Sequence, residues 1–178
     1  MANGDLPDKV LLVGFMASGK SSAGKELSSR LGWDFQDFDT VIAARAGKSI
    51  SRIFAEDGEA EFRRLESGVA EELLARSDTV VASGGGWPAQ PGAWKMVPED
   101  TLSVWLKVSP AVSVRRASEQ GPTRPLLDGG DVTERATALL LGREASYRRA
   151  RYTLDSEQYG PCQLADEIMK LMTRQGKT

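Results

Sequence analysis

Residues 9–21 have the sequence KVLLVGFMASGKS, and this stretch decides the fold. Its first part, 9–14, is a mainly apolar run typical of a strand buried on both faces of a sheet. Residues 14–21 match the pattern G-x-x-x-x-G-K-[ST], directly after that strand and opening a helix predicted over 18–31. In such a loop, backbone N–H groups surround a phosphate, Lys20 reaches the β- and γ-phosphates, and the Ser21 hydroxyl ligates Mg²⁺. The stretch therefore predicts a nucleotide-binding strand–loop–helix unit.

Shorter apolar runs alternate with helical patterns along the rest of the chain. Strands are predicted over 33–37, 79–83, 101–108 and 152–155, and helices over 40–46, 49–57, 59–77, 110–117, 132–150 and 162–173. The segment 118–131 is rich in Gly, Pro and charge and is predicted to be a loop. Strands separated by helices indicate a three-layer α/β/α fold with a five-stranded parallel sheet. No linker or repeat divides the chain, so we expect one domain over 1–178, with frayed ends at 1–8 and 174–178.

The composition excludes several kinds of catalytic site. The 178 residues contain no histidine and a single cysteine, so imidazole catalysis, His-ligated zinc and an intrachain disulfide are excluded. Cys162 is expected to be a half-buried structural thiol. Carboxylates, Lys, Arg, hydroxyls and backbone amides remain, and these are the groups that bind phosphate and Mg²⁺.

Charge and hydropathy narrow the expected partners and location. The net charge of −2 gives no reason to expect nucleic acid or an anionic membrane as a partner. No apolar run reaches the roughly 20 residues that span a bilayer. The acidic start MANGDLPDKV does not resemble a secretory signal. A cytoplasmic protein is the expectation.

The phosphate loop alone does not identify the acceptor of the phosphate. A GTPase would carry an N/T-K-x-D motif, which is missing, and the apolar run 79–83 ends at Ser83 rather than at an aspartate. Both observations favour a small kinase. Asp37 and Asp39 follow the second predicted strand, where one could hold metal-bound water and the other could accept a proton from an acceptor hydroxyl. On this pattern alone, Asp39 as a helix N-cap is an equally good interpretation.

Six motifs in order resemble those of the shikimate kinase family across 10–171, nearly the whole chain. They are GFMxSGKS, the D-x-D pair, GKSISRIFAEDGEAEFRRLE, GGG, RPLL and R-x-x-x-YR, and the third is the most specific. The resemblance implies an enzyme with a fold like that of nucleoside monophosphate kinases. It implies transfer of the γ-phosphate of ATP to the 3-hydroxyl of shikimate on the route to aromatic amino acids, with Mg²⁺, in a monomer.

The same resemblance assigns roles to residues of this chain. Asp39 would bind the acceptor hydroxyls and act as base, Asp37 would contact Mg²⁺ through water, and Arg63 and Arg143 would hold the shikimate carboxylate. Arg124 would belong to a lid over about 118–131, the helices over about 40–76 would bind the acceptor, and Arg116 would lie against adenine. The remaining implied contacts are Gly14, Ala17, Ser18, Gly19, Lys20, Ser21 and Ser22 for the nucleotide, and Gly84, Gly85 and Gly86 for the acceptor.

Three positions depart from the family pattern. Ala17 stands where the family usually has Gly, and it would strain the loop if the backbone there needs a positive φ. Trp87 replaces a small residue after the triple glycine, and it could narrow the acceptor pocket, stack beside it, or pack in the core. The lid segment differs slightly in length, so the adenine contact could fall to Arg115 instead of Arg116.

Alternatives to these interpretations stay open at this point. A kinase of another polyhydroxy acid, such as gluconate, would use the same scaffold, and a non-catalytic relative would keep the fold as a binding module. Arg64 is expected to be a solvated charge, and Glu66 could either orient Arg63 or form an ordinary helix pair with it. The basic cluster Arg148, Arg149 and Arg151 lacks a recognisable nucleic-acid module.

Overall fold

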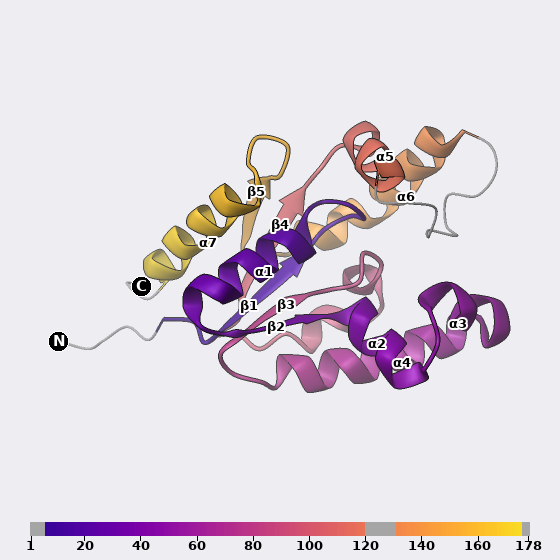
Figure 1. Ribbon diagram of the computed structural model, residues 1–178, viewed down its shortest axis with the longest axis horizontal. Coiled ribbons are helices and arrows are strands. Elements are labelled where there is room, and N and C mark those ends of the chain that lie inside the picture. The colour runs from indigo at the N-terminus through magenta and orange to yellow at the C-terminus, as the bar shows by residue number, and fades with distance from the viewer. Residues whose placement is uncertain (1–5, 120–130, 176–178) are drawn as a thin grey trace.

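The computed structural model describes residues 6–119 and 131–175. Figure 1 shows a central sheet with helices on both faces. The strands are β1 (Lys9–Val13), β2 (Asp34–Asp37), β3 (Thr79–Ala82), β4 (Leu102–Lys107) and β5 (Tyr152–Asp155). The α-helices are α1 (Lys20–Leu31), α2 (Phe38–Ala46), α3 (Ile50–Glu56), α4 (Gly58–Leu74), α5 (Pro110–Glu119), α6 (Val132–Tyr147) and α7 (Pro161–Gln175).

All five strands are parallel, in the order β2-β3-β1-β4-β5. The prediction of a five-stranded parallel sheet is confirmed. Strand β1 lies at the centre and its five residues are buried, as its uninterrupted apolar run requires. The order reverses at β1, because β3 pairs with one side of it and β4 with the other. A reversal of this kind leaves a crevice at the carboxyl ends of the strands.

Alternate side chains of β1 enter two separate cores, because successive side chains of a strand point to opposite faces. Leu11 and Val13 belong to a core that includes residues of α2, α4 and α6. Val10 and Leu12 belong to a second core that includes residues of α1 and α7. The sheet is therefore the middle of three layers, with α1 and α7 together on one face and α2, α4 and α6 on the other (Figure 1).

Capping side chains explain where three helices begin. The Ser49 Oγ accepts a hydrogen bond from the Arg52 N–H at the start of α3, although the sequence there has no capping-box acid. Asp131 caps α6 in the same way. Asp37 caps α2 by accepting from the N–H groups of Asp39 and Thr40, so the interpretation of Asp39 as N-cap was wrong.

Several boundaries differ from those predicted. Helix α5 continues to Glu119, so the predicted loop starts later than residue 118, and residues 120–130 of that loop lie outside the described residues. Helix α6 ends at Tyr147 rather than at 150. Two short 3₁₀ helices, Trp87–Ala89 and Ala93–Lys95, occupy a segment for which no helix was predicted.

Two single residues of these elements differ in exposure. Cys162 is exposed in the first turn of α7, so the expectation of a half-buried thiol was wrong. Trp105 is 4% exposed within β4 and is a core residue. Among the described helices, none combines the length and the apolar character that a bilayer span requires.

Candidate active site

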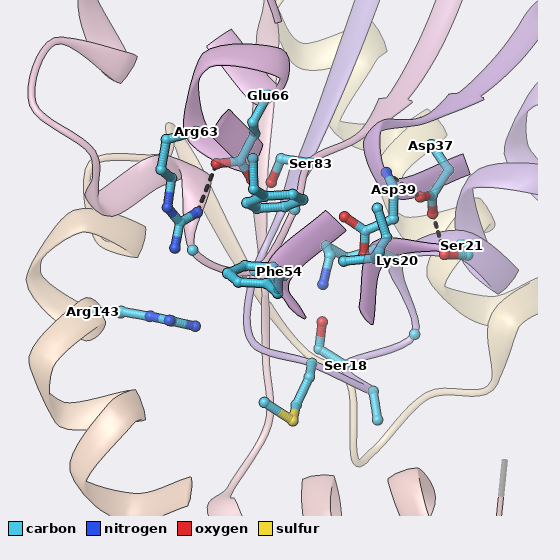
Figure 2. A pocket seen from close by; sticks show the side chains of 18 of the residues that line it. Ser18, Lys20, Ser21, Asp37, Asp39, Phe54, Arg63, Glu66, Ser83 and Arg143 are labelled. Atoms are coloured by element: carbon cyan, nitrogen blue, oxygen red, sulfur yellow. Dashed lines mark hydrogen bonds and ion pairs between the residues drawn. The ribbon is translucent and has the colours of Figure 1, made fainter. Parts of the chain in front are cut away.

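The carboxyl ends of β1, β2 and β3 meet at one cavity of about 370 Å³. Figure 2 shows Lys20, Ser21, Asp37 and Asp39 on one side of it and Arg63 and Arg143 on the other. The phosphate loop, the D-x-D pair, α3, α4, the triple glycine and α6 all contribute to its wall. The lining residues are Met16, Ala17, Ser18, Gly19, Lys20, Ser21, Ser22, Asp37, Asp39, Ile50, Phe54, Phe62, Arg63, Glu66, Ser83, Gly84, Gly85, Gly86 and Arg143.

The phosphate loop has the backbone geometry that its glycines permit. Gly14 has φ of 146°, and a Cβ there would lie 2.5 Å from the Leu106 carbonyl oxygen, so only glycine fits this close approach. Gly19 has φ of 90°. Ala17 has φ of 52°, in the left-handed region. The condition under which Ala17 would strain the loop is therefore met.

Lys20 is the first residue of α1, and its side chain reaches back across the phosphate loop. Its Nζ donates to the carbonyl oxygens of Gly14 at 3.0 Å and Phe15 at 2.8 Å. Ser18 is fully buried, and its Oγ has no hydrogen-bond partner among the described residues. A cation and a buried hydroxyl within a ring of backbone amides form a site suited to an anionic ligand.

The Ser21 hydroxyl and the Asp37 carboxylate lie together at one corner of the cavity. Ser21 Oγ donates to Asp37 Oδ2 at 2.6 Å, while Asp37 Oδ1 accepts from the Asp39 N–H at 3.0 Å. Both are hard oxygen ligands, which suits Mg²⁺. The described residues contain no cluster of three or more His, Cys, Asp or Glu side chains that could hold a metal ion. The pair therefore fits an ion whose other ligands are phosphate and water oxygens.

Arg63 and Glu66, one turn apart on α4, form a partly buried ion pair. The Arg63 Nη1 lies 2.7 Å from Glu66 Oε2, and the Arg63 Nη2 lies 3.1 Å from Glu59 Oε1. The Glu66 side chain is only 1% exposed, and its Oε1 has no hydrogen-bond partner among the described residues. Burial raises the pKa of Glu66, and the Arg63 charge opposes that rise. Glu66 therefore orients Arg63 from a buried position, unlike an ordinary solvated helix pair.

The triple glycine lies close to functional groups on both sides of the cavity. A Cβ on Gly84 would lie 2.4 Å from Glu66 Oε1, so a side chain there would displace the glutamate. A Cβ on Gly86 would lie 3.1 Å from Arg63 Nη1 and 3.4 Å from Arg143 Nη2, which is a tight fit. At Gly85 a Cβ would lie 3.5 Å from the Met16 backbone nitrogen in the phosphate loop, which is an ordinary van der Waals distance. The three glycines thus connect the neighbourhood of the two arginines to that of the phosphate loop.

Besides Met16 of the phosphate loop, four lining residues were not predicted from the sequence. Ile50, Phe54 and Phe62 provide an apolar wall, and the rings of Phe54 and Phe62 meet at a tilt of 34° with centroids 4.5 Å apart. The i, i+4 spacing of Ile50 and Phe54 on a short helix was the available signal. Ser83 was noted only because it is not an aspartate, yet it is 4% exposed and its Oγ has no partner among the described residues.

Trp87 is a core residue and does not narrow the cavity. It is 2% exposed, and its ring meets Phe38 edge to face with centroids 5.3 Å apart. It is not among the described residues that line the main cavity. It lines a smaller cavity of about 170 Å³ behind Arg63 and Glu66 instead. Of the interpretations left open for Trp87, core packing is confirmed.

The structure places the other basic residues in local contacts. Arg116 donates to the Ser156 carbonyl oxygen at 2.9 Å and lies outside the described cavity wall, so its adenine contact stays a prediction. Arg64 has 70% of its side chain exposed and pairs with Glu61, as expected for a solvated charge. Arg124 and the rest of the lid lie outside the described residues.

The basic cluster at the end of α6 is engaged in separate contacts. Arg148 pairs with Glu144 at 2.9 Å, Arg149 lies over the Trp94 ring, and Arg151 donates to the Glu99 carbonyl oxygen.

Comparison with known proteins identifies the family. The family model described as shikimate kinase matches residues 16–173. A shikimate kinase of Synechococcus sp. (strain CC9605) is 40% identical over 161 residues, covering 90% of this chain and 80% of that protein. Shikimate kinase from Acinetobacter baumannii, solved in complex with shikimate, superposes with a TM-score of 0.89 at 32% identity, covering 96% of this chain and 95% of that one.

A gluconokinase from Sinorhizobium meliloti 1021 superposes with a TM-score of 0.65 at 17% identity, covering 97% of this chain and 95% of that one. That likeness extends to the fold alone. The family match, by contrast, extends over 16–173, which includes most of the phosphate loop and all of α2, α3 and α4. The chain belongs to the shikimate kinase family.

Proposed function

We propose that this chain transfers the γ-phosphoryl group of ATP to the 3-hydroxyl of shikimate, giving shikimate 3-phosphate. One observation carries the proposal: one cavity has the phosphate loop and the Asp39 carboxylate on one side and two arginines on the other (Figure 2). Family membership and the likeness to a shikimate-bound relative support the same conclusion.

The acceptor end matches the chemistry of shikimate, which has one carboxylate and three hydroxyls. Arg63 and Arg143 both bring guanidinium groups close to Gly86, where a carboxylate could accept charge-assisted hydrogen bonds from both. Asp39 lines the cavity toward the phosphate loop and would accept hydrogen bonds from the hydroxyls. Gly84, Gly85 and Gly86 allow the substrate ring to approach the backbone.

At the donor end, the loop amides and Lys20 would hold the phosphates of ATP, with Gly14, Ala17, Ser18, Gly19, Ser21 and Ser22 around them. Ser21 would ligate Mg²⁺ directly, and Asp37 would do so through water. When bound, this ion would neutralise charge on the transferring phosphoryl group. Asp39 would take the proton from the 3-hydroxyl as its oxygen attacks in line, and Lys20 would stabilise the charge that develops on the phosphoryl oxygens.

The remaining assignments rest on the family resemblance. Arg124, in a lid over about 118–131, would add a cation to the γ-phosphate and exclude water, and Arg116 would lie against adenine. We further propose that the chain works as one domain and as a monomer in the cytoplasm, with neither nucleic acid nor membrane as a partner.

A coupled assay of ADP release with Mg-ATP tests the proposal, with shikimate, gluconate, quinate or no acceptor. We expect strong turnover with shikimate alone. Asp39→Asn should lower kcat by about a hundredfold or more, because it removes the base. The matched control is Asp34→Asn, the same change at the exposed opposite end of β2, which should leave kcat within about twofold.

Other outcomes would redirect the assignment. Turnover with gluconate in place of shikimate would favour the polyhydroxy-acid alternative. Equal slow ADP release with every acceptor would disprove the acceptor assignment and leave the phosphate loop as a nucleotide site.

A further inference from the structure

A buried tyrosine connects the helix of Arg143 to the triple glycine. Tyr147 lies one turn after Arg143 on α6 and is 0% exposed. Its hydroxyl donates to the carbonyl oxygen of Gly85. Its ring packs against Trp105 of β4, with ring centroids 5.9 Å apart. The ring is thus fixed by the core, and its polar end reaches the cavity wall.

The hydrogen bond is stable across the range in which an enzyme works. Burial raises the pKa of Tyr147 to about 12, against the opposing effects of the Arg143 charge and of a side-chain hydrogen bond with Arg143. The hydroxyl therefore stays protonated at neutral pH and can donate its hydrogen bond.

The accepted carbonyl belongs to the peptide that also contains the Gly86 N–H. A trans peptide is planar, and its C=O and N–H point in opposite directions. Holding the Gly85 carbonyl toward Tyr147 therefore turns the Gly86 N–H to the other side of the loop. A Cβ on Gly86 would lie 3.1 Å from Arg63 Nη1 and 3.4 Å from Arg143 Nη2, so this peptide lies close to both guanidinium groups.

Gly85 also lies close to the phosphate loop. A Cβ on it would lie 3.5 Å from the Met16 nitrogen and 3.6 Å from the Gly14 carbonyl oxygen. One hydrogen bond from α6 thus fixes the peptide that separates the donor end from the acceptor end.

We infer that Tyr147 is a positioning residue for the acceptor site, and that it acts by holding the Gly85–Gly86 peptide in place beside Arg63 and Arg143. The inference rests on the proposed function, because it assigns a role within the acceptor site. Tyr147 touches neither the phosphate nor the reacting hydroxyl. Its removal should therefore affect the acceptor and leave nucleotide binding unchanged.

The test uses Tyr147→Phe, which removes the hydroxyl and keeps the ring. We expect KM for shikimate, and its dissociation constant by calorimetry, to rise about tenfold, because the Gly85 carbonyl loses its buried donor. KM for ATP should stay within about twofold of the unaltered chain. A lower thermal midpoint is also expected, so both kinetic series are run well below it. A loss of stability alone would not raise KM for shikimate while leaving KM for ATP unchanged.

Tyr152→Phe is the matched control. Tyr152 is half-buried on β5 and packs on the other core, so both KM values should stay unchanged. If Tyr147→Phe leaves the shikimate constants unchanged, or shifts both KM values equally, the inference is wrong while the proposed function stands. If the unaltered chain neither binds nor phosphorylates shikimate, the proposed function is wrong and this inference falls with it.

Discussion

Ala17 holds a backbone conformation that an L-residue with a Cβ adopts with strain. Its φ of 52° lies in the left-handed region, at a position where the family usually has glycine. We expect Ala17→Gly to raise the free energy of unfolding by about 1 kcal/mol, because relief of the strain exceeds the extra flexibility of the unfolded chain. Denaturant titration measures this change.

The control for Ala17 is the same substitution in a helix. Ala44 is exposed within α2, where Gly should lower the free energy of unfolding by about 1 kcal/mol. The two variants therefore shift stability in opposite directions. A loss of stability in Ala17→Gly would mean that the loop gains more from a stiff residue than it loses to strain.

Glu66 makes stability depend on pH. Its pKa is raised in the folded chain by burial, above the ordinary glutamate value of 4.5. Between these two values the folded state binds more protons than the unfolded state, so stability falls as pH rises through this window. Below the window the group is protonated in both states, and above it the full penalty of a buried charge is present.

Glu66→Gln removes this titration and keeps the shape of the side chain. We therefore expect the unaltered chain to lose stability relative to Glu66→Gln as pH rises from acid to neutral, measured by urea unfolding at a series of pH values. The variant should also raise KM for shikimate, because Arg63 loses its buried anchor. A stability difference that is constant with pH would show that Glu66 does not titrate in this window.

At the scale of elements, one glycine sets how closely α1 lies on β2. A Cβ on Gly24 would lie 2.4 Å from Cε2 of Phe35. We expect Gly24→Ala to lower the free energy of unfolding by about 1–3 kcal/mol, because the ring must move out of a packed core. Thermal or denaturant unfolding checks this value.

Gly68 provides the comparison on α4. A Cβ there meets nothing within 4 Å among the described residues, so Gly68→Ala should raise the free energy of unfolding by about 0.5–1 kcal/mol through helix propensity. If Gly24→Ala were equally stabilising, α1 would have room to shift away from the sheet.

The elements that were predicted well are those with a strong local pattern. Strand β1 was evident from its apolar run, and α7 from one apolar face toward the core. The C-terminal ends of α5 and α6 were missed, because the positions where these helices stop depend on tertiary contacts rather than on a local pattern. The 3₁₀ helix at Trp87 was missed although Pro88 in its first turn is a local signal, and the buried contact of Trp87 with Phe38 has no local signal.

At the scale of the whole molecule, the parallel sheet brings the site together. The phosphate loop and the D-x-D pair could be predicted, because parallel strands end at a common edge. Two features could not be predicted. One is the burial of Glu66 Oε1 and Ser83 Oγ without a hydrogen-bond partner in the described part of the chain, and the other is the Tyr147–Gly85 hydrogen bond. These depend on which side chains meet across elements far apart in the sequence, and no local pattern contains that information.

The same parallel topology separates the two ends of the described chain from the site. Strand β1 begins, and α7 ends, at the amino edge of the sheet, opposite the edge where β1 leads into the phosphate loop (Figure 1). A fusion partner or a solid support joined at either end would therefore lie at the amino edge of the sheet. The cavity at the opposite edge would stay open to substrates, so an immobilised form of the protein should keep its site accessible to the solution.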